Sequence, residues 1–259
     1  SVLRKCARKI ASGEAENVSV TGTGLEKLLG PRMVKPEFLN RTNAIGIANG
    51  LAWTSIGGET LPIEVQVIDN GSGKITVTGS LGDVMKESAQ LAITYARVHA
   101  AEYGIDSERL KKCDLHIHAP EGAVPKDGPS AGVTLTTALI SCLSGIPVRG
   151  DVAMTGEITL HGNVLPIGGL REKSMAAYRE GMKTVLIPKD NLSDLYEVDD
   201  EVKKNIEFLP MQSLSQVLAA ALLKPRTVSA GHPRTRKVKP AEAAALPKTA
   251  EKPQPGAVC

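Results

Sequence analysis

The sequence predicts an α+β domain, in which mixed sheets and helices follow one another along the chain. Apolar and polar residues alternate at residues 61–67, as in a half-buried strand, whereas the apolar residues of 84–103 recur at the spacing of one helix face. The chain has 259 residues, of which 42% are hydrophobic and 23% charged. This is enough apolar material for the core of an ordinary globular protein.

The N-terminal segment predicts two short helices. Residues 2–10 resemble the last turns of an amphipathic helix, and a second helix around residues 25–29 stops at Gly30-Pro31. The segment is too small to fold alone, so we interpret it as the end of a preceding domain. Because the sequence starts without Met and inside a helix, we expect the chain to be part of a longer protein.

The first half of the body, from about residue 43, alternates between strand and helix patterns. Asp69-Asn70-Gly71-Ser72-Gly73 separates two strands and predicts a hairpin turn. Further on, a stretch that is apolar on almost every side is typical of a buried helix. The predicted elements are strands at 61–67 and 74–77, a helix at 84–103, a strand at 115–118 and the buried helix at 130–143.

The second half of the body, up to about residue 224, continues this alternation. A turn at His161-Gly162-Asn163 follows a strand, and Gly181 closes the next helix. The predicted elements are a strand at 152–160, a helix at 170–180, strands at 184–188 and 207–209, and a final helix at 213–223.

Residues 226–259 predict a disordered tail, because they are rich in Pro, Ala and Lys and contain almost no large apolar side chain. The tail has seven Lys or Arg and two Asp or Glu, a net charge of +5. The whole chain has a net charge of +3, so the other 225 residues carry −2. The folded part therefore does not indicate a nucleic-acid partner.

Composition also indicates the cellular setting. No run approaches the roughly 18 uncharged apolar residues of a membrane span, and the N-terminus has no apolar signal-peptide region, so we expect no membrane partner. The four cysteines are scattered without C-x-x-C spacing, which favours reduced thiols and a cytoplasmic location.

A candidate nucleophile lies at the start of the predicted buried helix. Gly128-Pro129-Ser130-Ala131-Gly132 matches the pattern G-x-S-x-G, which presents a reactive serine. A serine at a helix start is more often only an N-cap, so the catalytic interpretation needs a base. Downstream, His161 lies in a turn and His232 in the tail, which leaves a Ser-His-Asp esterase as a weakly supported alternative.

Lys173 is the other candidate base. A lysine accepts a proton near neutral pH only if burial lowers its pKa enough to populate the uncharged amine. On a helix that starts near Leu170, Lys173 shares a face with Leu170, Ala176 and Ala177. The alternative is an ordinary surface lysine whose stem covers apolar neighbours.

Two stretches resemble the proteolytic domain of the Lon proteases, which are ATP-dependent proteases of the bacterial cytosol and mitochondria. They are PKDGPSAG at 125–132 and MTGEITLHGNVLPIGGLREK at 154–173. The resemblance continues at GLAWT (50–54), GGE (57–59), HIHAPEG (116–122) and TVLIP (184–188), and it favours the bacterial A-type enzymes. It implies the Lon proteolytic-domain fold for residues 42–225, preceded at residues 1–35 by a short helical remnant of the α-helical subdomain of the AAA+ ATPase module.

The resemblance also implies roles for single residues. Ser130 would be the nucleophile and Lys173 the general base of a Ser-Lys dyad, with Thr155 orienting the lysine. Asp127 lies in a loop that is thought to switch between inactive and active conformations. A carboxylate near Lys173 would raise the pKa of the lysine and keep it protonated.

Supporting groups are expected around the nucleophile. The backbone N–H groups at the helix start would stabilise the oxyanion. Gly128 and Gly132 would let a substrate backbone approach closely, and Ala131 would support the site together with Gly128. Trp53 and Glu121 are expected in the substrate groove, although Trp53 fits a core tryptophan equally well.

The resemblance implies a serine endopeptidase of the cytoplasm that hydrolyses unfolded or damaged proteins, coupled to ATP hydrolysis in the full-length protein. The full-length enzyme would bind ATP and Mg²⁺ and form a homohexameric ring. Because this sequence lacks the ATP-binding motif G-x-x-x-x-G-K-[ST], we expect this chain to bind neither ATP nor Mg²⁺. No metal is expected, since nothing nearby completes a ligand set with His116, His118 and Cys113. A non-catalytic ring-forming module is the other alternative.

Overall fold

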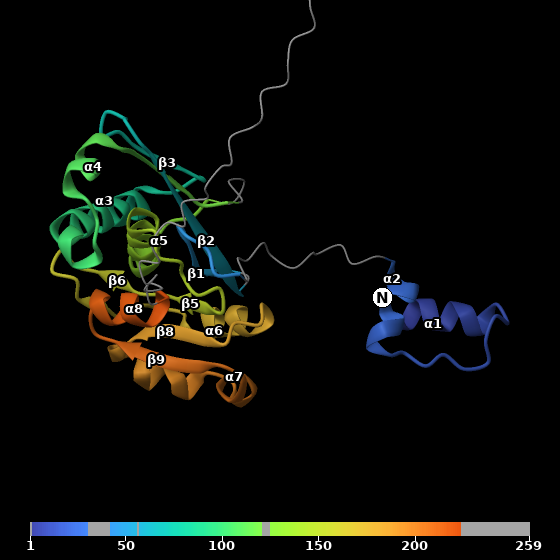
Figure 1. Cartoon of the computed structure of the whole chain (residues 1–259). Helices are drawn as coiled ribbons and strands as arrows, with labels where there is room; N and C mark the ends of the chain where they lie inside the picture. The colour runs from blue at the N-terminus through green and yellow to red at the C-terminus, as the bar shows by residue number, and fades with distance from the viewer. Residues whose placement is uncertain (1, 31–41, 56, 121–124, 224–259) are drawn as a thin grey trace, which may run out of the picture. The chain divides into compact units, whose positions relative to one another are not determined.

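The computed structural model of the protein describes residues 2–30, 42–55, 57–120 and 125–223 (Figure 1). The α-helices are α1 (Val2–Ala11), α2 (Leu25–Leu29), α3 (Asp83–Val98), α4 (Ser107–Lys112), α5 (Gly132–Ser144), α6 (Leu170–Arg179), α7 (Asp200–Asn205) and α8 (Leu214–Ala221). The 3₁₀ helices are η1 (Gly22–Gly24), η2 (Ala100–Tyr103), η3 (Pro129–Ala131) and η4 (Lys189–Glu197). The strands are β1 (Ile47–Thr54), β2 (Gly57–Ile68), β3 (Ile75–Thr78), β4 (Asp114–His118), β5 (Val152–Met154), β6 (Glu157–Ile158), β7 (Val164–Leu165), β8 (Thr184–Pro188) and β9 (Glu207–Met211).

A seven-stranded mixed sheet organises the body, with the strand order β3-β4-β2-β1-β5-β8-β9. β2 runs antiparallel to both of its neighbours, β1 and β4. The other neighbouring pairs in this sheet are parallel. β6 and β7 form a separate antiparallel pair. Strands of both directions in one sheet, with helices between them in the sequence, confirm the predicted α+β fold.

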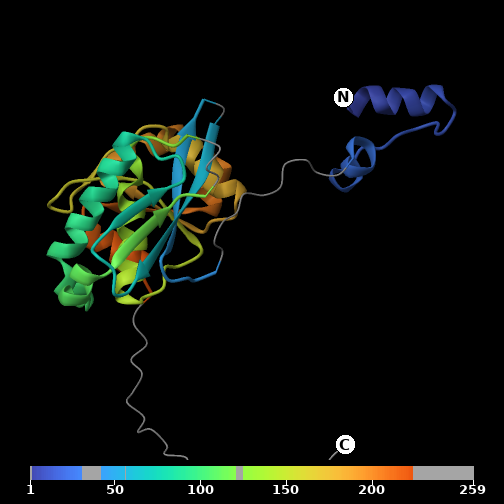
Figure 2. The same cartoon turned by 90° about the horizontal axis from the view of Figure 1, so that it is seen from above.

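Helices cover both faces of this sheet, as the two perpendicular views show (Figures 1 and 2). Side chains of β5 alternate between two apolar clusters, because Val152 and Met154 join one cluster and Ala153 joins the other. α3, α5 and α8 contribute to the first cluster, and α6 and α7 to the second. Strands with two covered faces are apolar at successive positions, which explains why β8 (TVLIP) is buried throughout.

The predicted hairpin between residues 61–67 and 74–77 is wrong, because β4 lies between β2 and β3. The Asp114 carboxylate at the start of β4 accepts hydrogen bonds from the backbone N–H groups of Ser72 (2.7 Å) and Lys74 (2.8 Å). The turn at residues 69–73 is therefore hydrogen-bonded to β4, and the strands that flank it, β2 and β3, do not pair with each other. From β3 the chain reaches β4 through α3 and α4, a helical crossover of the kind that joins parallel strands.

The predicted strand at 152–160 is also wrong in part, since it consists of β5 and β6 with a break between them. Gly156 lies in the break, where a Cβ would come within 2.9 Å of the side chains of both Val133 and Val164. This close packing turns the chain out of the main sheet. The other predicted elements are present, but the helix predicted at 84–103 ends as α3 at Val98 and is followed by the separate η2. The sequence patterns do not predict the strands β1 and β7 or the short helices α4, η4 and α7.

Residues 2–30 contain α1, η1 and α2, and α2 ends at Gly30, whose φ is 91°. α1 leaves apolar side chains exposed, with 80% of Leu3 and 49% of Ile10 accessible. The predicted tail at 226–259 lies outside the described residues. Within the described part of the chain, no helix is both long enough and apolar enough to cross a membrane.

Candidate active site

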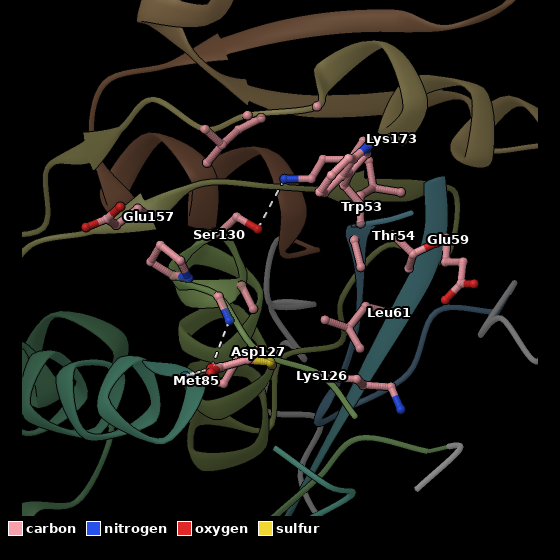
Figure 3. Close-up of a pocket in the computed structure, with 18 of the residues that line it drawn as sticks. Trp53, Thr54, Glu59, Leu61, Met85, Lys126, Asp127, Ser130, Glu157 and Lys173 are labelled. Carbon is pink, nitrogen blue, oxygen red and sulfur yellow. Dashed lines mark hydrogen bonds between the residues drawn. The ribbon is translucent and has the colours of Figure 1, made fainter. Parts of the chain in front are cut away.

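A cavity of about 790 Å³ lies along the end of β1 (Figure 3). Its walls come from β1 and the start of β2, from the loop at 125–131, and from residues 166–169, which precede α6. The pairing of β1 with β5 includes Gly50 but not residues 51–54, which line the cavity. One wall carries Ser130 and another leads into the helix of Lys173, so the cavity unites the two candidate catalytic residues.

A tight helical turn presents Ser130 to the cavity. Gly128 has a φ of 139°, which favours glycine and lets the chain turn into η3. Pro129 occupies the first helical position, where its missing N–H costs nothing. Ala131 is buried behind the turn, while Ser130 is half-buried and its hydroxyl points toward Lys173 (Figure 3).

The two glycines of this motif have different roles. A Cβ at Gly128 would meet no atom within 4 Å, and Gly128 lines the cavity, where a substrate backbone can approach. A Cβ at Gly132 would instead lie 2.9 Å from the Ile158 side chain. The expectation that Gly132 admits substrate is therefore wrong, because its missing side chain makes room for β6 against α5.

Lys173 lies on the buried face of α6, together with Leu170 and Ala177. Only 3% of its surface is exposed, and this burial lowers the pKa of the amine from 10.5 to about 8. With that pKa, about a tenth of the amine is uncharged at pH 7. The prediction of a buried lysine is confirmed, and the surface-lysine alternative is wrong.

A close contact between β2 and α6 sets the depth of Lys173. A Cβ at Gly58 would lie 1.9 Å from the carbonyl oxygen of Glu172, so only glycine lets the strand approach the helix this closely. Arg179, at the other end of α6, donates a hydrogen bond of 2.7 Å to the carbonyl oxygen of Gly58. Two residues of the helix that carries the amine, Glu172 and Arg179, therefore contact the same strand residue, Gly58.

The two side chains of the expected dyad and that of Thr155 meet in the structure. Lys173 Nζ donates hydrogen bonds to Ser130 Oγ at 3.1 Å and to Thr155 Oγ1 at 3.2 Å. Thr155 is itself positioned by its backbone N–H, which donates to the carbonyl oxygen of Leu186 in β8 at 3.1 Å. The Gly156 N–H donates to the carbonyl oxygen of Ser130 at 2.9 Å, which ties the segment of Thr155 directly to the turn of Ser130.

Asp127 lines the cavity but directs its carboxylate away from the dyad. Its Oδ1 accepts hydrogen bonds from the N–H groups of Met85 (3.1 Å) and Gly128 (3.0 Å). Met85 lies in the first turn of α3, so Asp127 caps that helix from another part of the chain. Burial lowers the pKa of Lys173 in this conformation, and no carboxylate is among the causes that would raise it again. The switching hypothesis stays a prediction, and it requires these two hydrogen bonds to break.

Trp53 lines the cavity and is 60% exposed, so it is not a core tryptophan. Its side chain packs on the backbone of Gly169, where an added Cβ would lie 3.0 Å from the indole. Gly169 is the N-cap residue of α6, which places Trp53 beside the helix of Lys173 (Figure 3). Glu121, the other residue expected in the groove, lies outside the described residues.

None of the four described histidines contacts the dyad. His116 Nε2 and His118 Nδ1 both contact Thr78 Oγ1, at 2.9 and 2.8 Å, and His99 Nδ1 contacts Glu102 Oε1 at 2.8 Å. His161 is an exposed residue of a turn. A Ser-His-Asp arrangement therefore has no support among the described residues. Nor do three or more His, Cys, Asp or Glu side chains gather to hold a metal ion within residues 2–30, 42–55, 57–120 and 125–223.

Several cavity residues were not predicted. Glu59 and Glu157 line the cavity at separate places (Figure 3), and each directly follows glycine in a motif of the sequence, GGE and MTGE. Leu61 and Met85 add apolar surface. Met85 comes from a helix far from the motifs in the sequence, and no local pattern indicates its place.

A half-buried serine hydroxyl in hydrogen-bond contact with a buried lysine amine, at the wall of a cleft, is the arrangement of the serine–lysine class of hydrolases. Residues 19–224 match the family model of the Lon protease (S16) C-terminal proteolytic domain. The chain belongs to this family, and it carries the family's proteolytic domain.

Relatives with the same family name are closely similar. The chain is 52% identical to the Lon protease of Brevibacillus choshinensis over 224 residues, which are 86% of this chain and 29% of that protein. It is 51% identical to the Lon protease of Desulforamulus reducens over 228 residues, which are 88% of this chain and 28% of that protein. The chain therefore spans less than a third of the length of these relatives.

Proposed function

We propose that this chain is the peptide-hydrolysing part of a Lon-type protease and works as a serine endopeptidase with a Ser-Lys dyad. The observation that carries the proposal is the 3.1 Å contact between Ser130 Oγ and the buried Lys173 Nζ. The uncharged amine takes the hydroxyl proton as Oγ attacks the scissile carbonyl carbon. It then passes this proton to the leaving amine of the substrate, and an acyl ester stays on Ser130. Water, deprotonated by the same amine, hydrolyses the ester and restores the hydroxyl.

Two further groups assist in this mechanism. Thr155 keeps the lysine amine directed at Ser130 through the 3.2 Å hydrogen bond. The N–H groups of Ser130 and Ala131 are the first after Pro129 in η3, so the helical turn itself does not use them. We assign these two N–H groups as donors to the oxyanion of the tetrahedral intermediate.

An extended polypeptide is the substrate that the cleft favours. Ala52 and Trp53 of β1 line the cavity beyond the pairing of this strand with β5, and a bound peptide can align along a strand of this kind. The cavity of about 790 Å³ accommodates several side chains of an extended segment. A folded protein does not present such a segment, so unfolded or damaged proteins are the proposed substrates.

The remaining proposals concern the longer protein. Residues 1–35 would be the end of an AAA+ module, 42–225 the proteolytic domain and 226–259 a basic tail. The full-length enzyme would bind ATP and Mg²⁺ in that module, assemble as a homohexamer in the cytoplasm and feed unfolded chains to this cleft. The relatives named Lon protease, which are more than three times as long as the matched part, support this organisation.

Covalent labelling tests the proposed function. A fluorophosphonate that reacts with activated serines should label Ser130 of this chain, as located by mass spectrometry, and a chromogenic peptide should be cleaved. Lys173→Ala should abolish both reactions. An esterase that uses histidine would keep them, whereas a ring-forming module without catalysis would show neither reaction in the wild type.

A further inference from the structure

The cavity wall at residues 166–169 has a support that the dyad mechanism does not use. Asn191 lies in η4, shortly after β8, and only 3% of it is exposed. Its Oδ1 accepts a hydrogen bond from the N–H of Ile167 at 2.9 Å, and its Nδ2 donates one to the carbonyl oxygen of Ile167 at 2.8 Å. One buried side chain thus holds both backbone polar groups of a wall residue.

A third hydrogen bond determines which way this amide faces. Asn191 Nδ2 also donates to Asp194 Oδ2 at 2.6 Å. A carboxylate can only accept, so the amide nitrogen must face Asp194 and the amide oxygen must face the N–H of Ile167. Donor and acceptor are therefore arranged along Ile167 as they would be on a neighbouring strand.

The wall at residues 166–169 needs a side-chain partner such as Asn191, because the strand pairing of β7 ends before this segment. The pairing of β7 with β6 ends at Leu165, and α6 starts at Leu170. Between them, Pro166 has no N–H to donate. The Ile167 side chain packs against the second apolar cluster, while residues 166–169 line the cavity. A shift of this segment would change the width of the cleft.

We propose that Asn191 is a positioning residue of the substrate cleft. It fixes the wall at residues 166–169 for an extended peptide and touches neither the dyad nor the substrate. Lys173 is joined to this wall by one helix hydrogen bond, from its backbone N–H to the carbonyl oxygen of Gly169 at 3.0 Å. Its depth is also held by contacts outside the wall, namely the close approach of Gly58 to α6 and the hydrogen bond to Thr155. Loss of the Asn191 amide should therefore impair peptide cleavage more than the reactivity of Ser130. This inference rests on the proposed function.

The main test compares Asn191→Ala with Asn205→Ala in the complete chain. Asn205 is exposed and donates its Nδ2 to the carbonyl oxygen of Glu201, so the control removes an amide hydrogen bond outside the cleft. For a peptide of about ten residues, kcat/KM should fall at least about 10-fold in Asn191→Ala and stay unchanged in the control. Labelling of Ser130 by a small fluorophosphonate should change less than about threefold. Equal losses in both assays, or no loss in either, would overturn the inference.

Asn191→Asp provides a second test that does not depend on the alanine variant folding. The aspartate has the shape of asparagine, but when ionised it cannot donate to the carbonyl oxygen of Ile167, and it faces the carboxylate of Asp194. When protonated it has one O–H group, which can donate to the carbonyl oxygen of Ile167 and so restore one of the two hydrogen bonds that the amide nitrogen makes. The ratio of variant to wild-type kcat/KM should therefore rise as the pH falls, and a ratio that is low and flat with pH would contradict the inference.

Hydrogen exchange separates this inference from the proposed function, because it requires no activity. The amide of Ile167 should exchange at least about 10-fold faster in Asn191→Ala than in the wild type. Unchanged exchange would contradict the role of Asn191 alone. Absence of Ser130 labelling in the wild type would contradict the proposed function and leave the exchange result to stand.

Discussion

The two walls that carry the dyad are built in different ways. At the start of α5, Gly128, Pro129 and Ser130 are consecutive residues, and each favours the turn that presents the hydroxyl. At α6, the residues beside Lys173 in the sequence do not explain its chemistry, which depends on β2 approaching the helix at Gly58. The position of the nucleophile is thus largely local, whereas the basicity of the amine is a property of the assembled domain.

Two lysines of the same chain show what burial contributes. Lys111 is exposed on α4, and its hydrogen bond to Glu108 raises the pKa of its amine. Lys173 is buried without such a partner among the causes of its shift, and its pKa falls to about 8. Only the second amine is suited to accept a proton near neutral pH.

The largest effect is expected from Lys173→Met, which replaces the amine by an apolar side chain of similar length. Peptide hydrolysis should fall by at least about 10⁴-fold, and Ser130→Ala combined with it should add little, because the two groups act as a unit. Lys111→Met is the exposed control and should leave the rate unchanged. Substantial residual hydrolysis in Lys173→Met would show that the base is another residue.

Gly58→Ala tests whether the sheet sets the depth of the amine. Its Cβ would lie 1.9 Å from the carbonyl oxygen of Glu172, so α6 must move away from β2. A displacement of about 1 Å should reduce kcat/KM about 100-fold. The fluorophosphonate labelling rate should fall in parallel. Gly22→Ala is the control, since a Cβ there would meet no atom within 4 Å, and wild-type activity in both variants would contradict the argument.

The pH dependence of hydrolysis should follow the Lys173 amine. With a pKa of about 8, the uncharged form falls about 50-fold between pH 8 and pH 6, and kcat/KM should fall with it. A midpoint near 10.5, the pKa of an exposed lysine, would mean that the amine is not buried when the enzyme acts.

The folding stability of the chain should also depend on pH through the Lys173 amine, and it should increase with pH because the pKa of this amine is lowered in the folded state. Between about pH 8 and 10.5 the unfolded chain binds the proton and the folded chain does not, so stability rises with pH in this range. Below about pH 8 the cost of burying the charge is fully present. Lys173→Met should therefore be more stable than the wild type, most clearly below pH 8, in thermal unfolding measured at several pH values.

Thr155→Val should have a smaller effect, because it removes only the hydroxyl that orients the amine. The loss of the 3.2 Å hydrogen bond should reduce kcat about 10-fold, and Thr155→Ser should recover most of it. Thr94→Val is a suitable control, since Thr94 is exposed and bonds only to its own helix. Equal activity of the valine and serine variants would show that the hydroxyl does not assist Lys173.

The smallest effect on chemistry is expected at Asp127. Asp127→Ala should reduce stability by about 1 kcal/mol through loss of the cap on α3, and Asp127→Asn should retain most of it. The midpoint of the pH–rate profile should stay the same in both variants. A midpoint that moves to lower pH in both would show that the carboxylate does approach Lys173, as the switching hypothesis requires.

Where the sequence interpretation went wrong, a distant contact overrode a local pattern. The turn at 69–73 predicts a hairpin, but Asp114, more than 40 residues further on, binds this turn and lets β4 enter. Gly132 was interpreted from its motif as an opening for substrate, but Ile158 occupies that space. The sequence around Asp127 does not predict its hydrogen bond to α3, and the sequence around Asn191 does not predict that its amide supports the cavity wall.

Periodicity and helix-end residues determined most of the longer strands and helices by themselves, because these signals depend on neighbours within one or two turns of chain. The same local chemistry, Gly128 and Pro129 before a buried helix, places Ser130 at a helix start where it is half-buried and faces the cavity. Only the tertiary structure decided that the amine of Lys173 is buried away from solvent. The pKa of this amine is lowered because α6 packs closely against β2 at Gly58, and no residue beside Lys173 in the sequence can exclude the solvent in this way.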